Sequence, residues 1–140
     1  MMKDGSHLVR RTQLQYHNML SFKLLSKLAS KPMKRFCTDP GFELRSSENI
    51  TIPAKSRSSV KTDLKITFPN GYFGLIVSLP ENSLNKKIDV ITTFVSNGAD
   101  SINVILDNKN EEEFKLSIMD PIGFLIPNKY MNMMFIYQEN

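Results

Sequence analysis

Histidine and cysteine are the side chains that most often bind metals or act as nucleophiles, and this chain holds only His7, His17 and Cys37. A structural zinc site takes four ligands, and no cysteine or carboxylate cluster stands beside either histidine. The single cysteine cannot form a disulfide within the chain, which favours a reducing compartment, and we expect a buried or neutral thiol. From these residues we predict no metal site and no required cofactor.

Basic residues are concentrated near the start of the chain. Of the 18 Lys and Arg and 14 Asp and Glu, eight basic residues and one acid fall within residues 1–38, so this segment carries +7 and residues 39–140 carry −3. We therefore divide the chain into a basic N-terminal extension, 1–38, and a separate domain, 39–140. The basic positions of interest are Arg10, Arg11, Lys23, Lys27 and Lys31.

Within the extension, residues 18–31 predict an amphipathic basic helix. Leucines recur every four residues, lysines follow the same spacing on another face, and Pro32 ends the pattern. The segment could pack on the domain or stay partly disordered, act as a mitochondrial presequence, or bind anionic membranes or nucleic acid. Translation starting at Met19 or Met33 is a further alternative.

From about Phe42 onward, the chain reads as short runs of β-branched and aromatic residues separated by turn signals, which predicts an all-β sandwich or barrel. Apolar and polar residues alternate most clearly in residues 59–66. A Pro-Asn-Gly turn at 69–71 separates two predicted strands. The longest apolar stretches are shorter than the roughly 20 residues that a membrane-spanning helix needs.

Several motifs then occur in an order typical of one enzyme family. "PGFELRSSENITIPAKSRSSVKTDLKITFPNGYFG" begins at Pro40 and is followed by "KIDV" at 87–90, "INVILDN" at 102–108 and "MDPIGFLI" at 119–126. Through these motifs, residues 40–136 resemble the trimeric deoxyuridine triphosphatase (dUTPase) family. The resemblance implies a dUTPase-like jelly-roll β-barrel or sandwich, here preceded by a helical or flexible basic extension.

The resemblance also implies a reaction, in which water attacks the α-phosphate of dUTP and magnesium bridges the phosphates. Such a site needs a carboxylate to orient the water, acids to hold the metal's waters and donors for the phosphates. Glu43 falls at the metal-associated aspartate and Ser96 at the general base, with Asp63 and Asp89 as further acids. Alternatively, Glu43 is a solvated carboxylate, and Asp63 and Asp89 make structural hydrogen bonds.

The phosphate loop departs from the family pattern at residues 78–81. Leu79 stands where the resemblance places arginine, and Pro80 stands where it places serine, so a hydroxyl and a backbone N–H are both lost. Glu81 follows and would repel a triphosphate.

The catalytic and late motifs depart as well. Ser96 cannot accept the proton of water unaided near neutral pH, and Asp100 lies four residues further on. Pro121 and Phe124 replace the arginine and glutamine of the late motif, and the glycine-rich lid is absent from the final residues. We therefore predict no catalytic residues and no enzymatic activity.

This pattern leads to the hypothesis of a catalytically eroded, non-enzymatic dUTPase-fold protein that acts by protein–protein interaction. The "NITIPA" and "FPNGYFG" motifs also resemble the adenoviral early-region accessory proteins, which predicts a viral accessory protein that modulates host signalling. The candidate partner surfaces are the remodelled loops, since loops on a rigid scaffold carry recognition. Their residues are Leu79, Pro80, Glu81, Asn97 and Asp100.

Two alternatives stay open. The first is a weak or residual dUTP-binding protein that uses Glu43, Asp63, Asp89 and Ser96, with magnesium only in that case. The second is nucleic-acid or anionic-membrane binding through the basic extension.

The resemblance implies a homotrimer. The apolar end of the chain, residues 130–140, predicts an edge strand that a neighbouring chain would cover, although a methionine-filled monomer core is an alternative. Host proteins are the predicted partners. We expect an intracellular location, in the host cytoplasm or nucleus, with mitochondrial targeting by residues 1–38 as an alternative.

Overall fold

The structure is a computed structural model that describes residues 19–131 and 134–139. Strands dominate the described residues, as the sequence predicts. They are β1 (Ser21–Leu24), β2 (Phe42–Arg45), β3 (Ile50–Ile52), β4 (Arg57–Lys61), β5 (Leu64–Thr67), β6 (Tyr72–Val77), β7 (Ile88–Val90), β8 (Thr93–Val95), β9 (Asn103–Asn108), β10 (Phe114–Leu116) and β11 (Pro121–Lys129), with one short helix, α2 (Pro80–Lys86).

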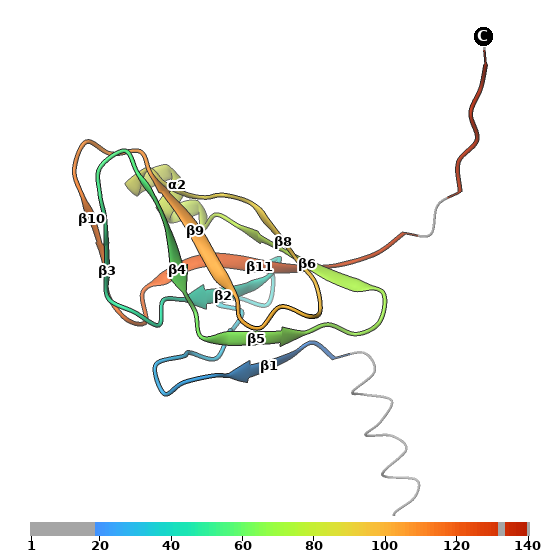
Figure 1. The fold of residues 1–140 in the computed structure, drawn as a ribbon, viewed down its shortest axis with the longest axis horizontal. Helices are drawn as coiled ribbons and strands as arrows, with labels where there is room; N and C mark the ends of the chain where they lie inside the picture. Colours follow the sequence, from blue (N-terminus) through green and yellow to red (C-terminus); the bar gives the residue numbers. More distant parts are fainter. Residues whose placement is uncertain (1–18, 132–133, 140) are drawn as a thin grey trace, which may run out of the picture.

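The strands pair in antiparallel fashion throughout the described residues. One sheet has the order β2-β11-β6-β8, a second has the order β4-β9-β7, and the remaining pairs are β1-β5 and β10-β3. In Figure 1, β4 and β9 cross the long strand β11, so the two larger sheets lie as separate layers. This arrangement confirms the predicted all-β fold.

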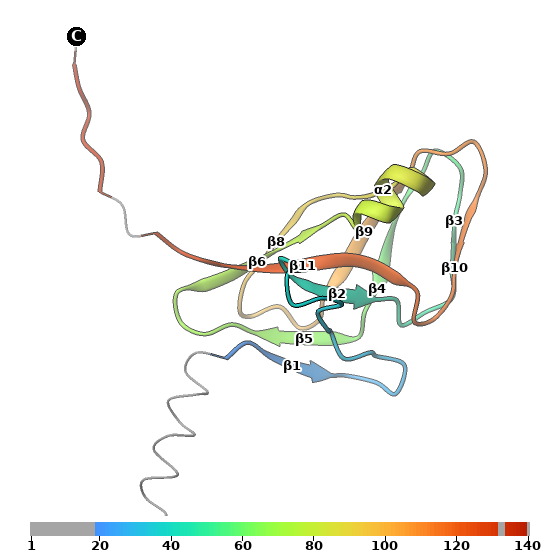
Figure 2. The ribbon, with the colours of Figure 1, turned by 180° about the vertical axis from the view of Figure 1, so that it is seen from behind.

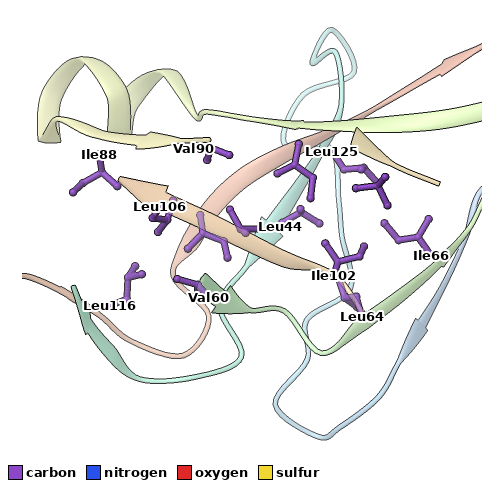
Figure 3. Packing of buried hydrophobic residues seen from close by; sticks show 14 of the residues in the cluster. Leu44, Val60, Leu64, Ile66, Ile88, Val90, Ile102, Leu106, Leu116 and Leu125 are labelled. Atoms are coloured by element: carbon purple, nitrogen blue, oxygen red, sulfur yellow. The ribbon is translucent and has the colours of Figure 1, made fainter. Parts of the chain in front are cut away.

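The core lies between these layers. Val60, Leu64 and Ile66 alternate with exposed residues along β4 and β5 and are at most 4% exposed, as their period-2 spacing predicts. Figure 3 shows Leu44 of β2 and Leu125 of β11 facing the interior, where Leu106 of β9 also lies. Burial of these apolar side chains is the main stabilising contribution to the fold.

Two turns explain where the strands end. The predicted turn at 69–71 is present: the Tyr72 N–H donates to the Pro69 carbonyl at 3.1 Å, and Gly71 has φ +84°. The alternating run at 59–66 is divided between β4 and β5. Asp63 has φ +52° there, and the buried Thr62 hydroxyl donates to the Ile102 carbonyl at 2.7 Å.

The predicted helix over 18–31 is wrong for the residues that the structure describes. Residues 21–24 form β1, which pairs with β5, and the Phe22 ring packs edge-on against Phe42 at 5.6 Å. The leucine spacing suited a helix, but the free edge of β5 provides backbone hydrogen bonds for a strand (Figures 1 and 2). Arg10 and Arg11 lie outside the described residues, and targeting by residues 1–38 stays a prediction.

Two further expectations need correction. The end of the chain is not an edge strand in the described residues, because β11 ends at Lys129, and residues 130–131 and 134–139 belong to no strand. Figures 1 and 2 show the end of the chain running away from the sheets. Cys37 is exposed, so of the expected buried or neutral thiol the first alternative is wrong. No helix within the described ranges is long and apolar enough to cross a membrane.

Candidate functional site

Glu43, in β2, lies at the centre of a cluster of charged side chains. Its side chain is only 3% exposed, and its two oxygens bind different cations: Oε2 lies 2.9 Å from Arg35 Nε, and Oε1 lies 2.7 Å from Arg45 Nη2. The segment before β2 brings Arg35 there, because the Glu43 N–H donates to the Met33 carbonyl at 2.8 Å. Glu43 is therefore a buried, fully paired carboxylate, and the alternative of a solvated one is wrong.

Arg35 connects Glu43 to two other positions that the sequence analysis singled out. Its Nη1 atom donates to Oε1 of Glu81, in the first turn of α2. Its guanidinium lies over the Phe124 ring, 5.1 Å from the centroid, and Phe124 is the cross-strand neighbour of Glu43 in β11. Glu43 at the metal-associated position, Glu81 beside the phosphate loop and Phe124 of the late motif therefore meet at one side chain from the N-terminal segment.

A groove of about 750 Å³ opens beside this cluster. Residues 27–35 form one wall, the turn at Ile118 and Met119 forms another, and Glu43 and Arg45 line it between them. Arg45 is held toward the second wall by a 3.1 Å hydrogen bond to the Met119 carbonyl. Five cationic side chains and one carboxylate line the groove, so it favours anions. The cations are Lys27, Lys31, Lys34, Arg35 and Arg45.

Asp89 lies at a separate position, in the strand β7 that follows α2. It accepts a hydrogen bond from the Ser83 hydroxyl and pairs with Lys109 Nζ at 2.7 Å. The hydrogen bond from Lys109, followed by that from Ser83, lowers the pKa of Asp89 below its usual value of 3.8. The Asp89 partner correspondingly raises the pKa of Lys109. These contacts agree with the structural alternative for Asp89.

Asp63 also has a structural environment. Its carboxylate accepts a hydrogen bond from the Ser26 hydroxyl at 2.7 Å, and its backbone carbonyl accepts one from the Leu25 N–H at 2.8 Å. These bonds fasten the turn after β1 to the start of β5. Asp63 therefore does not join the cluster around Glu43.

The remodelled loop that contains Leu79, Pro80 and Glu81 leads directly into the helix α2. Leu79 is fully buried beneath it, so it cannot contact a partner, and Pro80 occupies the first turn, where proline needs no N–H partner. Pro80 is exposed, and Glu81 is engaged by Arg35. Pro80 followed by Glu81 is a local signal for the start of a helix, so α2 could have been predicted from the sequence.

Ser96, Asn97 and Asp100 lie in the loop after β8, which borders a different groove, of about 440 Å³. Asn97 exchanges two hydrogen bonds with the backbone of Phe68, at 2.7 Å and 3.1 Å, and so fixes this loop to the end of β5. Ser96 and Asp100 are exposed. Within one protomer, the structure does not bring this loop into the cluster around Glu43.

Arg35, Arg45 and Lys109 were not predicted to belong to the site. Arg35 and Arg45 are eight residues before and two after Glu43, so a basic residue on both sides of a strand-end acid was the available signal. Lys109 carries no such signal, because it meets Asp89 only through the pairing of β7 with β9.

Side chains that commonly bind metals are scattered among the described residues. No group of three or more His, Cys, Asp or Glu side chains lies close enough together among them to hold an ion. Both Glu43 oxygens already bind guanidinium groups. His7 and His17 lie outside the described residues.

The chain belongs to the dUTPase family: the family model matches residues 29–139. It is 33% identical over 115 residues to the deoxyuridine 5′-triphosphate nucleotidohydrolase of Avian adenovirus 8, a match that covers 80% of this chain and 69% of that protein. It is 32% identical over 113 residues to a probable deoxyuridine 5′-triphosphate nucleotidohydrolase of Invertebrate iridescent virus 6. That match covers 80% of this chain and 38% of the longer viral protein.

Solved dUTPase structures share the fold. The dUTPase of Staphylococcus bacteriophage 80alpha with dUpNHpp superposes with a TM-score of 0.80 at 20% identity, covering 88% of this chain and 89% of that one. The dUTPase of phage phi11 superposes with a TM-score of 0.79 at 19% identity, covering 88% and 98%. The phi11 structure is described as revealing the coordination of a structural Mg(II) ion. The family membership therefore counts against the expectation of no cofactor, and in favour of its exception, magnesium with a bound nucleotide.

These matches overturn the prediction of a non-enzymatic viral accessory protein. The family and the relatives at 30% identity or more are named for nucleotide hydrolysis, and none of the matches supports a pseudoenzyme. The prediction of lost hydrolysis rested on single motif positions, whereas Arg35 and Arg45 bring guanidinium groups to Glu43 from outside those positions.

Proposed function

We propose that this protein binds dUTP and hydrolyses it to dUMP and pyrophosphate. The observation that carries the proposal is the family match over residues 29–139, together with relatives at 30–33% identity that are named deoxyuridine 5′-triphosphate nucleotidohydrolases. The cationic groove beside Glu43 supports it, since a triphosphate needs a concentration of positive charge.

Magnesium enters this proposal with the nucleotide. Mg²⁺ is commonly held by substrate phosphates and only one or two carboxylates, which suits a chain whose described residues form no three-ligand cluster. The role of the protein is then to bind and orient the charged nucleotide.

A multi-subunit site is part of the proposal. Active members of the family build each site from several subunits, and here the groove beside Glu43 and the loop around Ser96 are lined by different residues of one protomer. Exposed apolar side chains, including Phe94 at 55% and Ile136 at 83%, suit burial against another copy. Sedimentation at micromolar concentration would show a trimer, and a monomer would contradict this assembly.

Steady-state hydrolysis of dUTP, UTP, dCTP and dTTP by the full chain with magnesium tests the function. The proposal predicts a clear preference for dUTP. Glu43→Gln should lower kcat/KM, because it loosens both arginines, whereas Glu113→Gln, at an exposed carboxylate away from the groove, should leave it unchanged. Absence of dUTP turnover, or equal rates for all four nucleotides, would contradict the proposal.

A further inference from the structure

Arg35 occupies an unusual position, because it reaches the altered phosphate loop from the N-terminal segment and not from the loop itself. Leu79 is buried and Pro80 has no N–H, so these two positions offer a phosphate no donor. The Arg35 guanidinium lies at the start of the adjacent helix, bound to Glu81. It therefore places a cation next to the loop that lacks one.

The two carboxylate partners of Arg35 differ in their environment. Glu43 is 3% exposed and also binds Arg45, so it anchors the Nε side of the guanidinium permanently. Glu81 is 37% exposed, and Arg35 itself is 33% exposed. An ion pair in such contact with water is weak and exchangeable, so Glu81 is the partner that a competing anion can displace.

We propose that Arg35 is a phosphate-binding residue of this protein, and that Glu81 holds its guanidinium until the triphosphate chain of a nucleotide replaces the carboxylate. The planar guanidinium can donate bidentate hydrogen bonds to phosphate oxygens, and a triphosphate carries more negative charge than one carboxylate. The Phe124 ring packs against the Arg35 guanidinium, and Glu43 binds its Nε side. These two contacts keep the guanidinium oriented while phosphate replaces Glu81.

The neighbouring groove determines what kind of anion fits. Arg45 and three lysines line it with Arg35, which suits an extended chain of phosphates better than a single phosphate. This inference rests on the proposed function for the identity of the nucleotide, but the phosphate contact can be measured without turnover.

Calorimetric titration of the full chain with pyrophosphate, and separately with dUpNHpp, tests the inference. Arg35→Gln should weaken pyrophosphate binding about ten- to a hundredfold. Glu81→Gln should tighten it about two- to fivefold, because the competing carboxylate is gone. Arg57→Gln, which removes the same charge from an exposed position on β4, is the matched control and should change nothing.

An unchanged or weaker affinity in Glu81→Gln would overturn the inference, and so would equal losses in Arg35→Gln and Arg57→Gln. If Arg35→Gln fails to fold, Glu81→Gln still tests the inference, because loss of the Glu81 carboxylate leaves the buried ion pairs of Glu43 intact. If dUTP is hydrolysed while Arg35→Gln binds pyrophosphate normally, the inference fails and the proposed function stands. If the predicted affinity changes occur without hydrolysis, the proposed function fails and the inference stands.

Discussion

The Nε atom of Arg35 lies 2.9 Å from Oε2 of Glu43, and this contact connects the N-terminal segment to the central sheet of the domain. Glu43 is buried and carries a second cation, Arg45, on its other oxygen. A buried carboxylate is tolerated only when its charge is compensated, so the two arginines stabilise the fold as well as the groove.

Arg45→Gln should therefore destabilise the protein. The substitution leaves the buried Glu43 with one cationic partner, which we expect to lower the free energy of unfolding by about 3 kcal/mol. Urea denaturation monitored by circular dichroism measures this difference. Arg57→Gln removes an exposed arginine whose carboxylate partner is 3.6 Å away and should cost less than about 0.5 kcal/mol. Equal midpoints for the two variants would contradict the assigned role of Arg45.

Asn108 provides a test of the fold far from the groove. It is fully buried, and its amide group donates to the carbonyls of Ile52, Pro53 and Glu112 at 3.0–3.2 Å. Asn108→Asp replaces these donors by a carboxylate oxygen that faces carbonyls, which should cost at least about 2 kcal/mol at neutral pH. Asn103→Asp, at an exposed position of the same strand, is the control. A similar thermal midpoint for both variants would refute this account of Asn108.

The pair of Asp89 and Lys109 predicts a pH dependence of stability. Hydrogen bonds from Lys109 and Ser83 lower the pKa of Asp89 in the folded state. The pair therefore stabilises the protein above the unfolded-state pKa of about 3.9, and this contribution is lost as the pH falls through the lower folded-state pKa. Urea unfolding of wild type and Asp89→Asn should differ at about pH 6 and converge in stronger acid. A difference that is constant over this range would contradict the prediction, and Lys109→Gln should reproduce the convergence.

The pairing of β1 with β5 predicts the outcome of two truncations. Removal of residues 1–27 takes away β1 and the Ser26 hydroxyl that binds Asp63, and so exposes the edge of β5. We expect a lower thermal midpoint for this variant. Removal of residues 1–18 keeps these contacts and serves as the control. If both truncations leave the midpoint unchanged, β1 contributes nothing to the stability of the domain.

The parts of the fold that depend on local signals could be predicted from the sequence. The turn that joins β5 to β6 follows from the chemistry of residues 69–71, although the two strands belong to different sheets. The alternation of Val60, Leu64 and Ile66 identifies the core face. The β1 strand could not be predicted in this way, because leucines four residues apart suit a helix until a free strand edge is available.

The candidate site was predicted only in part, for a similar reason. Glu43 was identified as a candidate through the resemblance, but its burial depends on two arginines that the fold brings to it. Arg35 meets Glu81, 46 residues further along the chain, and no local pattern encodes such a contact. The inference that hydrolysis had been lost assumed that no other segment could supply charged groups.

Phosphorus NMR of dUTP incubated with the full chain and magnesium tests the central claim most directly, because it identifies the phosphate bond that is cleaved. The account predicts that the dUTP signals are replaced by those of dUMP and pyrophosphate in equal amounts, and that a sample without protein stays unchanged. Persistence of the dUTP signals, or conversion to dUDP and orthophosphate, would contradict the account.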